Sequence, residues 1–162
     1  MPRRSRSAQR ISAASFPARK AARQVSGSSP RPPSYQIRRD LVARDPGAYR
    51  PALASTLNNL ANLYHDTDRP AAAEKVLSEA LSIFRDLAAD DPAYRPMLAA
   101  DLTNIGSLYA QSGRMVEAEQ AFKENLAVYR ELAAIDPAQY AGEVETLTKL
   151  LAEIHTSISA KR

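Results

Sequence analysis

The chain has 162 residues, of which 44% are hydrophobic and 25% are charged, and this suits one domain with a modest core. It has no cysteine, which excludes disulfides, thiolate nucleophiles and cysteine-based zinc sites. The net charge of +4 hides an asymmetry, because residues 1–39 hold ten of the 22 basic residues and none of the 18 acidic ones. A basic N-terminal segment therefore precedes an acidic body.

Residues 1–34 are rich in Arg, Ser, Ala and Pro, and this composition predicts a disordered basic tail. A solvated extension is the simplest interpretation. Two alternatives stay open: a tether to nucleic acid or acidic lipid, and an organelle transit peptide. Phe16 is the only aromatic residue before Tyr35, so nothing in the tail favours base stacking. We expect a cytoplasmic protein for which nucleic acid is an unlikely partner.

Residues 35–158 repeat themselves. The stretch Leu57 to Tyr64 reads Leu-Asn-Asn-Leu-Ala-Asn-Leu-Tyr, and about 45 residues later Leu102 to Tyr109 reads Leu-Thr-Asn-Ile-Gly-Ser-Leu-Tyr. Apolar residues at three- and four-residue spacing predict two amphipathic helices in each repeat. A repeat of this length made of helix pairs indicates an all-α fold, an α-solenoid of antiparallel helix hairpins.

Asp-Pro pairs divide the chain, because aspartate caps a helix and proline suits its first turn. They predict a half-repeat, two repeats, a capping helix and a C-terminal tail, at residues 35–45, 46–91, 92–136, 137–158 and 159–162. We expect the first helix of the first repeat to begin at the second proline, Pro51, and to end at His65. The partner helix spans about 70–89, and the last helix about 140–158.

Small residues are expected where paired helices cross, among them Ala61, Gly106, Ala73 and Ala118. Glu119 and Lys123 are spaced for an ion pair along one helix. The two histidines have different expected roles. His65 falls at an exposed helix end, whereas His155 takes the place of a core tyrosine of the other repeats and is predicted to pack in the core.

The repeats resemble the tetratricopeptide repeat, whose pattern is matched by Gly106, Tyr109, Gly113, Ala118 and Phe122. The long second helix is similar to the variant seen in kinesin light chains and many bacterial regulatory proteins. The resemblance covers roughly residues 36–158. It implies a non-enzymatic scaffold or adaptor that binds another protein.

The resemblance also implies that the first helices of successive repeats line a concave face. The predicted partner-binding residues on that face are Asn58, Asn59, Asn62, Thr103, Asn104, Ser107, Gln111 and Lys149. Asparagine amides both donate and accept, so they can pair with the backbone of an extended peptide. The alternative is that they brace neighbouring helices. A clamp for a C-terminal carboxylate is not expected, since Lys149 is the only lysine on this face.

No catalytic residue, cofactor or metal site is predicted. The paired carboxylates Asp66/Asp68 and Asp90/Asp91 fall in turns, where capping explains them, and no phosphate loop, catalytic triad order or metal spacing is present. Three hypotheses follow: a module that binds a peptide or partner helix, a self-associating structural fragment of a longer array, and a scaffold for the basic tail. No stretch is apolar enough to predict a membrane span.

Overall fold

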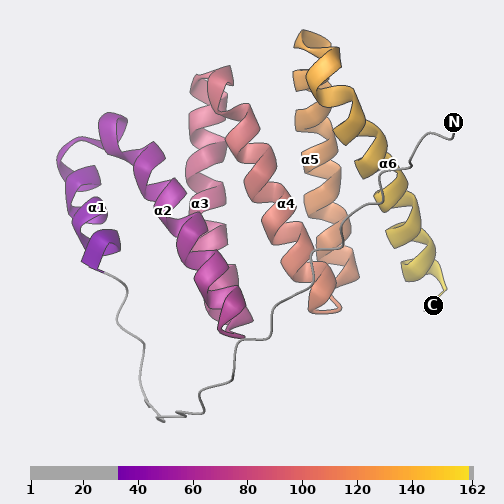
Figure 1. Ribbon diagram of the computed structural model, residues 1–162, viewed down its shortest axis with the longest axis horizontal. Helices are drawn as coiled ribbons and strands as arrows, with labels where there is room; N and C mark the ends of the chain where they lie inside the picture. Colours follow the sequence, from indigo (N-terminus) through magenta and orange to yellow (C-terminus); the bar gives the residue numbers. More distant parts are fainter. Residues whose placement is uncertain (1–32, 161–162) are drawn as a thin grey trace, which may run out of the picture. The chain divides into compact units, whose positions relative to one another are not determined.

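The computed structural model describes residues 33–160, and every regular element within them is helical. The order is α1 (Pro33–Arg44), α2 (Pro46–Asp66), α3 (Pro70–Asp90), a 3-10 turn η1 (Pro92–Tyr94), α4 (Arg95–Gln111), α5 (Met115–Ile135) and α6 (Pro137–Ser159). Each helix packs against the next one along the chain, with α2, α4 and α6 in front of α3 and α5 in Figure 1. This confirms the predicted all-α solenoid of antiparallel hairpins. The predicted basic tail lies almost wholly outside the described residues.

The Asp-Pro pairs act as helix caps. The carboxylate of Asp45 accepts a hydrogen bond from the Ala48 amide at 3.2 Å, and that of Asp136 accepts one from the Gln139 amide at 3.1 Å. Each bond satisfies an amide that has no partner inside its helix, and the following proline needs none. The same device therefore starts α2 and α6.

The predicted start of α2 at Pro51 is wrong, because the helix begins at Pro46 and carries Pro51 inside it. The Asp45 cap allows the preceding turn to be helical, and Pro51 then removes one backbone bond without ending the helix. In the second repeat Asp91 accepts from Ala93, two residues on, at 2.9 Å, and closes the tighter turn η1. There the helix does begin beside the second proline. The last helix likewise starts earlier than predicted, at Pro137.

The turns inside the two hairpins are built alike. Asp68 and Gly113 occupy equivalent positions and have left-handed backbone angles, with φ of 54° and 76°. The amide of the next residue then bonds back to the end of the preceding helix, Arg69 to Tyr64 and Arg114 to Tyr109. Glycine adopts this conformation at no cost, and aspartate tolerates it better than most residues.

The core follows the predicted stripes. Leu57, Phe84 and Leu102 are almost fully buried, together with the small residues Ala73 and Ala118. Gly106 is small for a steric reason, since a Cβ there would lie 2.9 Å from the ring of Phe122. The predicted ion pair between Glu119 and Lys123 is present at 2.9 Å.

His155 does not pack in the core as predicted. Its side chain is 73% exposed, and its Nδ1 lies 3.3 Å from the carboxylate of Glu119. In the second repeat the equivalent Tyr109 is half-buried because the following hairpin turn places Arg114 over its ring, 4.3 Å from the centroid. His155 thus lies at the surface beside Glu119 instead of packing in the core.

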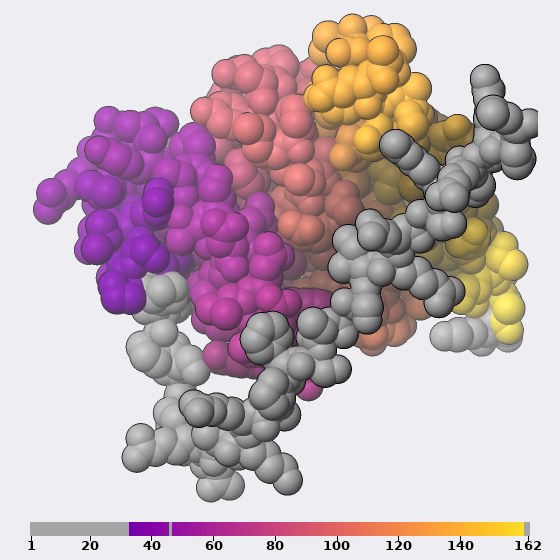
Figure 2. All heavy atoms as spheres, viewed as in Figure 1, coloured from indigo at the N-terminus to yellow at the C-terminus, as the bar shows by residue number. Residues whose placement is uncertain are grey.

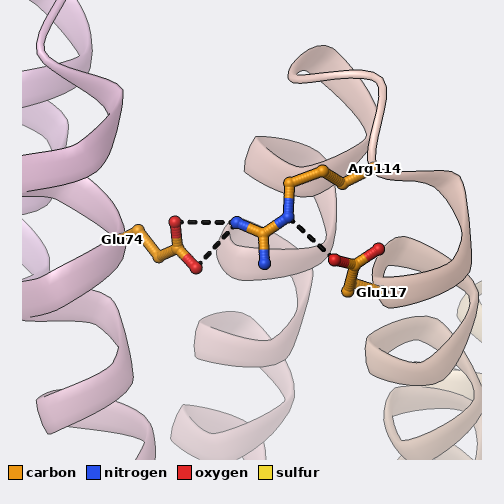
Figure 3. A network of polar contacts seen from close by, with 3 residues as sticks. All are labelled: Glu74, Arg114 and Glu117. Carbon is orange, nitrogen blue, oxygen red and sulfur yellow. Dashed lines mark hydrogen bonds and ion pairs between the residues drawn. The ribbon is translucent and has the colours of Figure 1, made fainter.

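Arg114 also ties the two repeats together, as Figure 3 shows. Its guanidinium bonds to both carboxylate oxygens of Glu74 in α3 at 2.8 Å and to Glu117 in α5 at 2.9 Å. On the same side of the molecule Arg85 of α3 forms a two-point contact with Glu124 of α5. Two charged contacts therefore link α3 of the first repeat to the second hairpin.

Candidate functional site

The surface formed by α2, α4 and α6, here called the first-helix face, carries the candidate site (Figure 2). Two cavities lie along it, and they are built alike. The first has walls from α2 and α4 with α3 beneath, and the second has walls from α4 and α6 with α5 beneath. Ser107 lines both cavities, so they adjoin across α4.

The first cavity has a volume of about 170 Å³, and both polar and apolar groups line it. Its lining residues are Ala61, Asn62, His65, Ala73, Leu77, Asn104, Ser107, Leu108 and Gln111. Four of the eight predicted partner-binding residues are thus brought together here: Asn62, Asn104, Ser107 and Gln111. His65 joins them, and its position one turn after Asn62 is the one feature of the sequence that could have placed it there.

The amides of Asn62 and Asn104 are available to a ligand. Both side chains are exposed, and neither forms a hydrogen bond with another described residue. At the end of the cavity His65 Nε2 lies 2.9 Å from Gln111 Oε1, which links α2 to α4 and leaves the Gln111 NH₂ free to donate. Each free amide offers two donor hydrogens and an acceptor oxygen, the set that an extended backbone requires.

The second cavity has a volume of about 380 Å³ and is lined mainly by apolar and aromatic groups. Its lining residues are Thr103, Ser107, Phe122, Tyr129, Gly142, Glu143, Thr146, Leu147 and Leu150. Most of these were missed by sequence reasoning, which looked for polar residues on the first helices. The alignment of α6 with α4 contained a signal, because Leu150 stands where α4 has Asn104.

The remaining predicted residues lie elsewhere. The hydroxyl of Thr103 is engaged internally, donating to the Ala99 carbonyl at 3.0 Å and accepting from the buried Asn125 amide at 2.7 Å. Asn59 lies in a shallow cavity between α1 and α2. Lys149 is exposed on α6 and pairs with Glu145 one turn earlier at 2.5 Å. These three are not brought together with the first cavity.

Asn58 faces inward, toward Asp101 of α4. The Asp101 side chain is fully buried, and neither of its oxygens, nor Oδ1 of Asn58, has a hydrogen-bond partner of good geometry. Burial raises the pKa of Asp101 to about 7, against the opposing effects of the Asn58 side chain and the Arg85 charge. Asn58 is thus directed toward α4 and does not line the first cavity.

The described residues offer little for other chemistries. In residues 33–160 no three histidine or carboxylate side chains gather closely enough to hold a metal ion. None of the helices in this part of the chain combines the length and the apolar character that a bilayer crossing requires.

Comparison with protein families gives a match to the tetratricopeptide repeat at residues 53–93 and again at 99–136. Comparison with curated proteins finds no match. The two matched segments fall on the hairpins α2–α3 and α4–α5, the same pairs that carry the repeated sequence. The family generally mediates contacts between proteins. With its repeated sequence, its hairpins and both family matches in agreement, the chain belongs to the tetratricopeptide repeat proteins.

Proposed function

We propose that this protein is a non-catalytic interaction module that binds an extended peptide segment of another protein along the first-helix face. The observation that carries the proposal is the pair of free amides, Asn62 and Asn104, on opposite walls of one cavity. Their spacing across α2 and α4 presents donors and acceptors from two helices to the same ligand. Such groups pair with a peptide backbone whatever its side chains are.

The opposite face of the molecule is less suited to binding a peptide. The cavity there, between α3 and α5, is crossed by the ion pair of Arg85 and Glu124, whose charged groups already satisfy each other. A ligand would have to displace that contact. The amides of the first-helix face can bind without breaking any bond within the described residues.

The test uses the full chain and a displayed library of random 12-residue peptides. Selected peptides are measured by fluorescence polarisation against the wild type and the double variant Asn62→Ala/Asn104→Ala. Losing two or more hydrogen bonds should raise Kd about tenfold. Light scattering at each concentration used separates peptide binding from self-association.

The matched control is Ser78→Ala/Gln120→Ala, which removes two exposed polar side chains from the opposite cavity. It should leave Kd unchanged. Peptides that bind both double variants as well as the wild type would show that the amides are not used, and the proposal would fail. Circular dichroism checks that both variants keep their helices.

A further inference from the structure

The second cavity contains a glycine that packing does not explain. Gly142 lies inside α6, where glycine costs about 1 kcal/mol relative to alanine. A Cβ built on Gly142 meets no atom within 4 Å, in contrast to Gly106, whose Cβ would strike the Phe122 ring. The fold does not need the missing side chain at 142. Gly142 lines the second cavity and carries no side chain that could occupy it.

The interior of this cavity is suited to a large apolar group. Phe122 and Leu147 are buried beneath it, and Tyr129 and Leu150 are half-buried at its walls. The volume of about 380 Å³ falls in the range of small-ligand pockets, roughly 300–1,000 Å³. An entering side chain would remove apolar surface from water on both partners, which is favourable.

The rim of the cavity is acidic. Glu143 is exposed and has no ion-pair partner among the described residues, whereas its neighbour Glu145 pairs with Lys149. The carboxylate lies close enough to Tyr129 to add to the rise in that hydroxyl's pKa, which burial mainly causes. No basic residue lines the cavity. A cation on the ligand would meet a free negative charge here, and an anion would be repelled.

We infer that the second cavity anchors a large apolar side chain of a peptide in which a lysine or arginine is adjacent. The anchor sits between α4, α5 and α6, and the cation pairs with Glu143. This inference rests on the proposed function and adds the chemistry of the partner: an apolar and basic segment. Since Ser107 lines both cavities, the peptide backbone would continue across α4 to Asn104 and Asn62.

The test uses the full chain and three blocked dipeptides as probes: N-acetyl-Phe-Arg amide, N-acetyl-Phe-Glu amide and N-acetyl-Gly-Arg amide. Binding is followed by amide chemical shifts in titrations at low salt. The Phe-Arg probe should saturate shifts at Gly142, Thr146 and Ser107, and should bind about two- to fivefold more tightly than Phe-Glu, as one exposed ion pair allows. The Gly-Arg probe should give no saturable shift.

Two variants separate the anchor from the charge. Gly142→Phe fills the mouth and should abolish binding, while its control Gly142→Ala improves the helix without reaching the interior and should bind like the wild type. Glu143→Gln should keep binding of both Phe probes and remove the preference for Phe-Arg. High salt should reduce the same preference in the wild type.

Equal affinity for Phe-Arg and Phe-Glu, or unchanged binding by Gly142→Phe, would overturn the inference, as would the absence of saturable shifts with every probe. The double variant Asn62→Ala/Asn104→Ala should bind the Phe-Arg probe normally, because a dipeptide does not reach the first cavity. A different pair of results would separate the two proposals. If that variant no longer binds the 12-residue peptides, but the wild type does not prefer Phe-Arg over Phe-Glu, the proposed function stands and the apolar and basic partner is rejected.

Discussion

The two cavities of the first-helix face lie between equivalent helices but have different linings. Asn62, Leu77 and Asn104 of the first correspond to Ser107, Phe122 and Leu150 of the second. These are the three positions that the two linings share, and at each of them the residue type differs; the other lining residues lie at different places along the helices. Both cavities lie between successive first helices, α2 and α4 in one case and α4 and α6 in the other. The individual residues decide what the cavity can hold.

The same contrast runs through the core beneath. In the first repeat Ala61 and Leu77 both line the first cavity, and in the second the equivalent pair is Gly106 and Phe122. Glycine allows the larger ring to approach, so the volume of the pair is roughly conserved. The apolar floor of the second cavity depends on this exchange.

The largest expected effect on stability comes from a change in the Gly106–Phe122 pair. Gly106→Ala places a Cβ 2.9 Å from the Phe122 ring and should destabilise the protein by about 1–3 kcal/mol, even though alanine favours the helix. Adding Phe122→Leu recreates the Ala–Leu pair of the first repeat and should recover part of the loss. Urea unfolding of the two single variants and the double variant measures the coupling. If the changes in the free energy of unfolding of the two single variants simply add in the double variant, the Phe122 ring does not require a glycine at position 106.

The second expected effect is a pH dependence of stability that only the second repeat contributes through Asp101. The buried Asp101 takes the place of Thr56, whose hydroxyl bonds to the Ala52 carbonyl at 2.8 Å. Because burial raises the folded-state pKa of Asp101 to about 7, the folded chain holds a proton that the unfolded chain releases. The contribution of Asp101 to stability is therefore greatest below about pH 4 and is lost as the pH rises to about 7.

Asp101→Asn removes this titration and should raise the free energy of unfolding at pH 8 by on the order of 2 kcal/mol. The difference from the wild type should shrink as the pH falls from 7 toward 4, because the folded wild-type carboxyl becomes protonated over this range. Thermal unfolding of both proteins across this range gives the difference directly. A difference that stays constant with pH would contradict the raised pKa.

Exchanging the cavity residues sharpens the comparison further. Leu150→Asn gives the second cavity the amide of the first and should cost about 1–2 kcal/mol of stability, because Leu150 packs against the core. Leu150→Asn should also weaken binding of the Phe-Arg probe. The reciprocal change Asn104→Leu lies on an exposed position and should alter stability by no more than about 0.5 kcal/mol. Chemical denaturation and the dipeptide titration check both.

The smallest expected effect compares two equivalent arginines. Arg69 and Arg114 both lie over a tyrosine ring, at 4.7 and 4.3 Å from the centroids of Tyr64 and Tyr109, but only Arg114 also bonds to Glu74 and Glu117. Arg114→Ala should therefore lower Tm more than Arg69→Ala does, and the excess should shrink at high salt. Equal losses for the two variants would mean that the link between repeats contributes nothing measurable.

Much of the fold could be predicted because it repeats. Two aligned copies of the pattern around Leu57 and Leu102 identified the hairpins, the buried stripes and the caps, and the family match agrees. The start of α2 was mispredicted because proline signals a boundary only when no earlier cap exists, and Asp45 supplies one. His155 was mispredicted because its tyrosine counterparts owe their cover to an arginine from the next turn.

The candidate site was less predictable than the fold. Sequence spacing places Asn62 and Asn104 on first helices, and the structure puts both on one cavity. Spacing cannot distinguish Asn58, which turns inward to Asp101, from Asn62 one turn later. The second cavity draws on three helices and on the absence of a side chain at Gly142, and neither property is visible in a repeat pattern.

The most direct test of the account is to locate a bound peptide on the molecule. A 12-residue peptide selected by the full chain is titrated into isotope-labelled protein, and the shifted amides are mapped. We predict saturable shifts along the first-helix face, at Asn62, Asn104, Ser107 and Gly142, with none at Ser78 or Gln120. Shifts confined to the opposite face between α3 and α5 would contradict the claim that the first helices form the binding surface.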